Sequence, residues 1–307
     1  MGLFNYDYES AGPGIAKNAP QKKGLALFFD IFYRKKWKIT GLNILFFIFF
    51  IPVILMLPAV YYIKQPYVCI GVLAVLFLIF TVNIGPALAG MTKVMRFFII
   101  ERHTFVMRDF FKGYKQNFKK ASIIGVFDVL VAASAYAGYN VYPDLAQLYN
   151  SKIFYVPLIL TFSIALVAVM MNYYIFLMMT ATDLSLKNLI KNSFALAFVS
   201  LKQNIITTFM IVILGSIMVI LLLYAVPLFM LVMPFFPAAL MWFIACFNSY
   251  PVIQKYVIDP FYAEKGEINP EKADVFDEID EETVFEDMGG KEKPIEKRAK
   301  GKGKHIS

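Results

Sequence analysis

Long apolar segments recur along the chain and are separated by shorter polar ones. A helix needs about 20 consecutive apolar residues to cross the roughly 30 Å hydrocarbon core of a membrane. Six segments meet this requirement, at about 39–63, 67–92, 121–141, 153–181, 205–225 and 228–250. The pattern therefore predicts an all-α fold, a polytopic transmembrane helical bundle of six spans. A kink or re-entrant stretch in 226–237, which holds three prolines, would reduce the number to five.

The composition favours a lipid environment over an aqueous one. Hydrophobic residues make up 59% of the 307 positions and charged residues 17%, against about a quarter charged in an ordinary soluble domain. The formal net charge of +8 does not indicate nucleic acid, because the basic residues lie between apolar segments rather than on one soluble face. Cys69 and Cys246 lie inside apolar segments, where neither suits a disulfide or a metal site. The lipid bilayer is the expected partner.

The distribution of Lys and Arg predicts the orientation, since short loops rich in these residues stay on the cytoplasmic side. Residues 1–38 and 93–120 are strongly basic, and basic residues also occur in 182–204 and after the last span. The loops on the other side contain only Lys64 and Lys152. An even number of spans then places both termini in the cytoplasm, with 39–258 as the transmembrane domain.

Two of the predicted cytoplasmic segments are amphipathic. In 93–120, apolar side chains alternate with Lys and Arg at helical spacing, which is typical of a helix in the membrane interface; 182–204 is shorter and less charged. The chain is therefore expected to form three hairpins, each preceded by a cytoplasmic elbow, the first elbow being the end of the basic segment 1–38. The tail 259–307 has an acidic run and then a basic run with few large apolar residues, and is predicted to be disordered.

Several short stretches resemble one known family. They are Leu3–Asp7 with Gly12–Gly14, Phe28–Lys38, Gly85–Ala87, and Arg108–Phe111 with Lys115–Phe118. In this order they are similar to the YesL family of bacterial membrane proteins, also called DUF624, and the resemblance extends over most of residues 1–255. The family has no settled molecular activity, but its members are often encoded beside genes for carbohydrate uptake and polysaccharide breakdown. The resemblance implies a bacterial plasma-membrane protein near sugar import, with a carbohydrate ABC importer or another membrane protein as partner.

Asp128 is the most unusual residue within a predicted span. It lies about seven residues into the third segment, roughly 10 Å from the cytoplasmic boundary at about 1.5 Å per residue. An ionisable group at that depth is a functional candidate by default, although a structural carboxylate hydrogen-bonded inside the bundle is the simpler interpretation. Asn83 and Asn172 either bond between helices, as Asn43 can, or join Asp128 in lining one polar cavity.

The second segment contains Gly85 and Pro86, followed by Ala89 and Gly90. Gly85 and Ala89 are four residues apart, a spacing of small residues that allows two helices to pack closely, and Pro86 favours a kink. The alternative is an interrupted helix whose free backbone groups line a substrate cavity.

A basic and aromatic stretch lies in the first predicted elbow between spans. Its candidate docking residues are Arg108, Asp109, Phe110, Phe111, Lys115 and Asn117. Such a stretch can bind a partner protein or anionic lipid. Charges beside phenylalanines at a membrane surface more often simply anchor a helix there, and this is the favoured interpretation.

No sequence feature indicates an enzyme. The chain has two histidines, His103 and His305, and lacks the Gly-x-Ser-x-Gly, His-Glu-x-x-His and Walker A patterns, so no catalytic, cofactor-binding or metal-ligating residue is predicted. The Glu-Ala-Ala loop of a binding-protein-dependent permease is also absent between the fourth and fifth segments. We therefore expect a non-enzymatic membrane protein that assists or regulates uptake of carbohydrate or another solute. The alternatives are a secondary transporter with a cavity near Asn83, Asp128 and Asn172, and a membrane scaffold or assembly factor.

Overall fold

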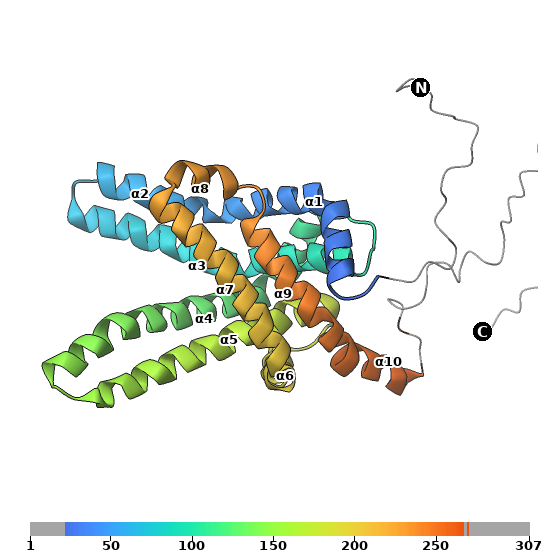
Figure 1. The fold of residues 1–307 in the computed structure, drawn as a ribbon. Helices are drawn as coiled ribbons and strands as arrows, with labels where there is room; N and C mark the ends of the chain where they lie inside the picture. Colours follow the sequence, from blue (N-terminus) through green and yellow to red (C-terminus); the bar gives the residue numbers. More distant parts are fainter. Residues whose placement is uncertain (1–21, 267–268, 270–307) are drawn as a thin grey trace, which may run out of the picture. The chain divides into compact units, whose positions relative to one another are not determined.

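The computed structural model describes residues 22–266 and 269, and every regular element within them is helical (Figure 1). The α-helices are α1 (Leu25–Phe47), α2 (Ile51–Tyr62), α3 (Pro66–Ile99), α4 (Val106–Leu148), α5 (Tyr155–Ala181), α6 (Leu186–Val199), α7 (Leu201–Tyr224), α8 (Val226–Val232), α9 (Pro237–Ile253) and α10 (Asp259–Lys265). Short 3₁₀ turns join α1 to α2 at Ile48–Phe50 and precede α5 at Lys152–Phe154, and a π-helical turn, Gln254–Ile258, follows α9.

Five helical segments are long and apolar enough to cross a membrane, which confirms the transmembrane helical fold class by length and composition. They are α1 with α2, α3, α4, Lys152–Ala181 and α7. The predicted sixth span is a broken element: α8 and the helix that begins at Pro237 meet at an angle of 55°. By length and composition, residues 22–266 therefore contain five candidate spans, or six if this bent pair is one span, and the break lies among the prolines that the sequence indicated.

The two predicted elbows differ in the structure. Residues 93–120 form no separate helix, because α3 continues to Ile99 and α4 begins at Val106 and runs on without interruption. Residues 182–204 do contain a separate short helix, α6, which Ser185 caps by accepting a hydrogen bond from the backbone N–H of Asn188 at 3.4 Å. The placement of either segment in a membrane interface remains a prediction.

By its contacts the chain divides into two units, residues 1–260 and 261–307. Helices α1 to α9 belong to the first unit, in which α2 packs on α3, α4 on α5 and α7 on α9, and the contact between α3 and α4 is the most extensive. The predicted tail begins as a helix, α10, rather than as a disordered segment. Residues 1–21, 267–268 and 270–307 lie outside the described residues.

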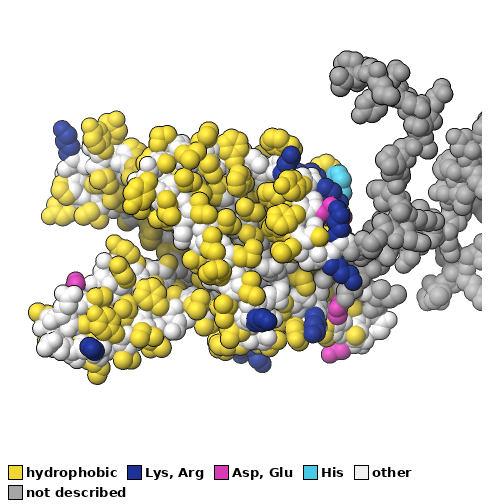
Figure 2. Space-filling view, in the orientation of Figure 1, with side chains coloured by type: hydrophobic (Ala, Val, Ile, Leu, Met, Phe, Trp, Pro, Cys, Tyr) yellow, Lys and Arg dark blue, Asp and Glu magenta, His cyan; other side chains and the backbone are white. Residues whose placement is uncertain are grey.

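The buried core of the first unit lies at one end of its long helices. The buried residues of α3 begin at Gly85 and those of α5 at Ala168, whereas α2 contributes none. Toward the turns at 63–65 and 149–151, the α2–α3 pair and the α4–α5 pair diverge (Figure 1), and the space-filling view shows an open cleft between them (Figure 2). Hydrophobic side chains cover the sides of the helices, which suits contact with lipid.

Candidate functional site

Glycines bring the backbones of α3 and α4 into direct contact. A Cβ atom added at Gly85 would lie 2.0 Å from the backbone oxygen of Ala121, and one added at Gly90 would lie 2.7 Å from that of Phe110. From the other helix, a Cβ at Gly125 would lie 2.8 Å from the backbone nitrogen of Gly85. Residues of this size are required wherever two helices approach so closely.

The other two residues of the predicted packing motif are also buried. Ala89 is fully buried, and Pro86 is also buried. The helix runs through Pro86 without a break, so the alternative of an interrupted helix that exposes its backbone to a cavity is wrong. The arrangement supports close helix packing at this site.

Asp128 and Asn172 form a polar pair between α4 and α5. The Asn172 side-chain nitrogen donates a hydrogen bond to Asp128 Oδ1 at 2.8 Å, and both side chains are partly buried. The other polar atom of the amide, Asn172 Oδ1, is buried and has no hydrogen-bond partner among the described residues. The pair thus combines one satisfied hydrogen bond with one buried acceptor that lacks a donor.

The third residue of the predicted polar cavity lies in a different pair. Asn83 accepts a hydrogen bond from the hydroxyl of Tyr114 and donates one to the backbone oxygen of Ile79 at 2.7 Å. The bond with Tyr114 joins α4 to α3, the bond with Ile79 lies within α3, and neither reaches Asp128 or Asn172. The structure therefore brings together two of the three predicted residues and provides Asn83 with a separate partner.

Cations link neighbouring helices at the end where the core lies. Arg34 of α1 donates to both carboxylate oxygens of Glu101, at 3.0 and 3.2 Å. Three further cations donate to backbone oxygens that follow or end neighbouring helices: Lys38 to Thr104 at 3.2 Å, Arg96 to Thr180 at 2.7 Å and Lys120 to Leu184 at 2.9 Å. The bond to Thr180 satisfies a carbonyl group that the end of α5 leaves unpaired, and the other two bonds satisfy carbonyl groups in the loops before α4 and α6. These links were not anticipated individually, although the basic flanks indicated where they would occur.

The predicted docking residues have unequal roles at the start of α4. Phe110 is fully buried, and Asp109 accepts a hydrogen bond from the backbone N–H of Phe105 at 2.9 Å. Asn117 donates to Gly113 O within its own helix at 3.2 Å, while Lys115 is exposed. Of the predicted docking residues, Arg108 and Lys115 are therefore exposed and Phe111 is partly exposed.

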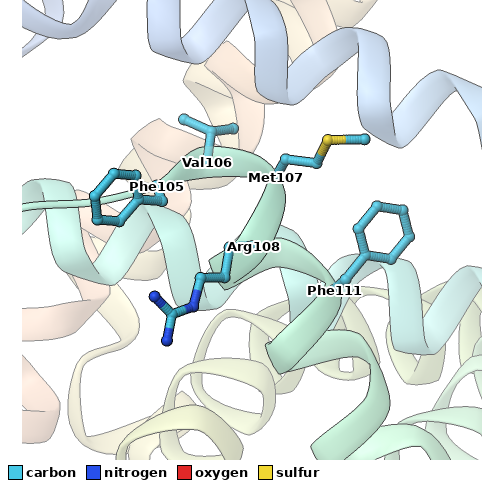
Figure 3. A pocket seen from close by; sticks show the side chains of 5 residues that line it. All are labelled: Phe105, Val106, Met107, Arg108 and Phe111. Carbon is cyan, nitrogen blue, oxygen red and sulfur yellow. The ribbon is translucent and has the colours of Figure 1, made fainter.

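A shallow hollow of about 520 Å³ surrounds Arg108 and Phe111. Its remaining lining residues are Phe105, Val106 and Met107. Phe105 immediately precedes α4, and the other four side chains project from the beginning of that helix (Figure 3). Phe105 and Met107 are 60% and 64% exposed. Arg108 forms no hydrogen bond or ion pair with any described residue. Sequence reasoning missed Phe105 and Met107, although both are apolar residues beside the Arg-Asp-Phe-Phe stretch.

A second hollow, of about 490 Å³, lies between α4, α5 and α6. Its lining is almost wholly apolar, with Phe127, Met171 and Phe194 among the larger side chains and Ser163 as the one polar residue. Neither hollow is lined by Asn83, Asp128 or Asn172. Within the described residues no group of three or more His, Cys, Asp or Glu side chains could hold a metal ion.

Comparison with known proteins gives one match. No curated protein and no solved structure matches the chain. A model of the family described as "Protein of unknown function, DUF624" matches residues 39–139, from within α1 to the C-terminal part of α4. This match supports the resemblance to the DUF624 family over that part of the chain.

Proposed function

We propose that the protein is a non-enzymatic, multi-pass protein of a bacterial plasma membrane, of the YesL type, that assists or regulates uptake of carbohydrate or another solute. It does so by binding a membrane partner, such as a carbohydrate ABC importer, at its cytoplasmic end. The observation that carries the proposal is the hollow around Arg108. There an arginine without a partner among the described residues lies between exposed apolar side chains.

The chemistry of this hollow suits a protein partner. Arginine and large apolar side chains such as Phe and Met are enriched at protein interfaces, because they combine a large contact area with a planar hydrogen-bonding group. An acidic side chain of the partner would supply the missing ion pair for Arg108, and its apolar neighbours would cover Phe105 and Met107. The same residues would otherwise remain exposed at the end of a packed helix.

The positions of the cations support the proposed orientation. Lys and Arg gather where α1 begins and where α3 passes into α4, whereas the opposite ends of the long helices show few of them (Figure 2). Loops rich in these residues stay in the cytoplasm, so the hollow around Arg108 faces the cytoplasm, as do both termini if the bent α8–α9 pair counts as one span.

The arrangement of the polar residues favours this role over that of a secondary transporter. Transport through the bundle would need a polar cavity that holds a solute near the membrane midplane. Asp128 and Asn172 instead bond to each other, Asn83 bonds to Tyr114, and the hollow between α4, α5 and α6 is apolar.

Cysteine labelling in intact cells tests the orientation. In a background that carries Cys69→Ala and Cys246→Ala, single cysteines at Gln65 and Gln147 should react with a membrane-impermeant maleimide. Cysteines at Lys115 and Lys202 should react only after the membrane is permeabilised. Reaction of Lys115→Cys from outside would invert the proposed topology and remove the cytoplasmic docking surface.

A charge reversal tests the docking surface. Arg108→Glu should weaken association with the importer about tenfold or more, because an interface that loses one member of a buried charge pair typically loses at least about 1.4 kcal/mol. Lys187→Glu is the matched control, since Lys187 is an exposed cation on α6 away from the hollow.

Both effects can be measured with the full-length protein in its own membrane. A photo-crosslinking amino acid at Met107 should capture an importer subunit, and Arg108→Glu should reduce both that crosslink and the initial rate of sugar uptake. The Lys187→Glu variant should retain both. Normal uptake and an unchanged crosslink in Arg108→Glu would refute the docking proposal, as would a crosslink to lipid alone.

A further inference from the structure

The Asp128–Asn172 pair leaves one of its polar atoms unexplained. The amide nitrogen of Asn172 donates to Asp128 Oδ1 at 2.8 Å, yet Asn172 Oδ1, in the plane of the same amide, is buried without a donor among the described residues. Buried acceptors in proteins almost always have a hydrogen-bond donor, so a donor for Asn172 Oδ1 is expected nearby.

The protonation state of Asp128 determines whether its carboxyl group can be that donor. An ionised carboxylate only accepts hydrogen bonds, so it can pair with the Asn172 nitrogen but would face the Asn172 oxygen as a second acceptor. A carboxylic acid has one O–H donor and retains an acceptor oxygen. An acid and a primary amide placed side by side can therefore form two parallel hydrogen bonds, of which the structure already contains one.

Most charged and phenolic groups on the elements around α4 have partners other than Asp128. Helices α1, α3 and α5 and the 3₁₀ turn Lys152–Phe154 pack against α4. On the three helices, six such groups bond elsewhere: Arg34 to Glu101, Lys38 to Thr104, Lys93 to Gln116, Arg96 to Thr180, Tyr173 to Thr208 and Tyr174 to Asn204. The remaining cations of these elements are Lys35 and Lys36 of α1 and Lys152 of the turn. Among the described residues no Lys, Arg or His forms a salt bridge with Asp128. Nothing there balances a negative charge within the α4–α5 contact.

The apolar hollow next to the pair reinforces this point. Ile124 and Phe127 of α4 and Ala168 and Met171 of α5 line it, and they flank Asp128 and Asn172 along their helices. An isolated carboxylate in such surroundings lacks the hydration that it has in water.

From this geometry we propose that Asp128 is a proton-binding site: it is protonated in the folded protein and donates its proton to Asn172 Oδ1. The two side chains then form a closed acid–amide pair that joins α4 to α5. The bound ligand is a proton, and the inference stands independently of the docking surface at Arg108.

A hydrophobic carbodiimide tests the proposal chemically. The acid adds across one C=N bond of the reagent, so that the carboxyl oxygen bonds to the central carbon and the carboxyl proton moves to nitrogen. The adduct then rearranges to a stable N-acylurea, and nothing leaves, so the labelled peptide gains the full mass of the reagent. The exposed carboxyls of Asp144 and Asp183 provide internal controls and should remain unlabelled.

Infrared spectroscopy of the full chain in lipid provides a measurement that does not depend on reagent access. The wild type minus Asp128→Asn difference spectrum at neutral pH should contain one carboxylic-acid C=O stretching band. In Asn172→Val that band should move to higher frequency, because the acid oxygen loses the hydrogen bond from the amide. The Asp128→Asn variant should keep its fold, since a second amide can form the same two bonds with Asn172.

The carboxylic-acid band distinguishes a protonated Asp128 from an ionised one. A band in the difference spectrum supports the proposal, whether or not the carbodiimide reaches Asp128, and labelling at Asp128 but not at Asp144 or Asp183 supports it further. A difference spectrum without an acid band, or with bands of an ionised carboxylate in its place, would overturn the proposal.

Discussion

Gly85→Ala should destabilise the protein by about 3 kcal/mol, a large effect for the addition of one methyl group. The new Cβ would lie 2.0 Å from the backbone oxygen of Ala121, far inside the distance that two such atoms tolerate. The clash involves backbone on both sides, so no side-chain rotation can relieve it, and α3 and α4 must separate. That separation would loosen the most extensive helix contact in the structure. Thermal unfolding in mild detergent measures the loss.

Gly71→Ala is the matched control, because Gly71 lies in the same helix and a Cβ there would meet nothing within 4 Å. This variant should be neutral or gain up to about 1 kcal/mol from the better helix propensity of alanine. Gly125→Ala should behave like Gly85→Ala, since its Cβ would meet the backbone nitrogen of Gly85 at 2.8 Å. If Gly85→Ala and Gly71→Ala unfold at the same temperature, the backbones of α3 and α4 are not in contact.

The sequence predicted the helical membrane class because a spanning helix depends on local composition alone. A run of apolar residues long enough to cross the membrane identifies it, and no partner is needed. The same reasoning predicted close packing at Gly85 but not the partner helix. Ala121 and Gly125 are also four residues apart, and this second pair of small residues was the signal that could have identified α4.

The grouping of polar residues was harder to predict, because it depends on how far one helix slides along another. The glycine contacts fix the register of α3 and α4, and in that register Asn83 meets Tyr114. Asp128 lies beyond this contact and meets Asn172 of α5 instead. The depth of each polar residue along its predicted span followed from the sequence. Its partner on the neighbouring helix depends on how each helix is rotated about its axis and on the register between the two helices, and no local sequence pattern indicates either.

The break between α8 and α9 depends on Asn43, a residue that the sequence indicated only as a general interhelical amide. Within an α-helix the carbonyl of Met233 would accept from the residue four positions later, but that residue is Pro237, which has no N–H. Asn43 supplies the missing donor: its side-chain nitrogen lies 3.0 Å from Met233 O and 2.8 Å from Pro234 O. The partner is irregular backbone about 190 positions away in the sequence, so periodicity could not reveal it.

The same amide also serves the helix that follows the break. The backbone N–H of Ala239, in the first turn of α9, donates to Asn43 Oδ1 at 2.9 Å, where the helix itself provides no acceptor. Asn43 is fully buried, and its three bonds satisfy groups on both sides of the break. One side chain of α1 therefore bonds to the backbone on both sides of the break.

Asn43→Leu should cost about 2 to 3 kcal/mol, because it keeps the approximate size of the side chain but leaves two carbonyls and one buried N–H without their partner. Asn43→Asp should be at least as harmful, since its carboxylate can accept from Ala239 but would repel the carbonyl oxygens of Met233 and Pro234. Asn140→Leu is the control: Asn140 is exposed and bonds only within its own helix, to Tyr136 O at 2.8 Å, so its loss should change stability by less than about 0.5 kcal/mol. Thermal unfolding in detergent gives the global effect, and hydrogen exchange should show faster exchange in 226–240 for Asn43→Leu alone. Equal unfolding temperatures and equal exchange in the Asn43→Leu and Asn140→Leu variants would show that the break forms without Asn43.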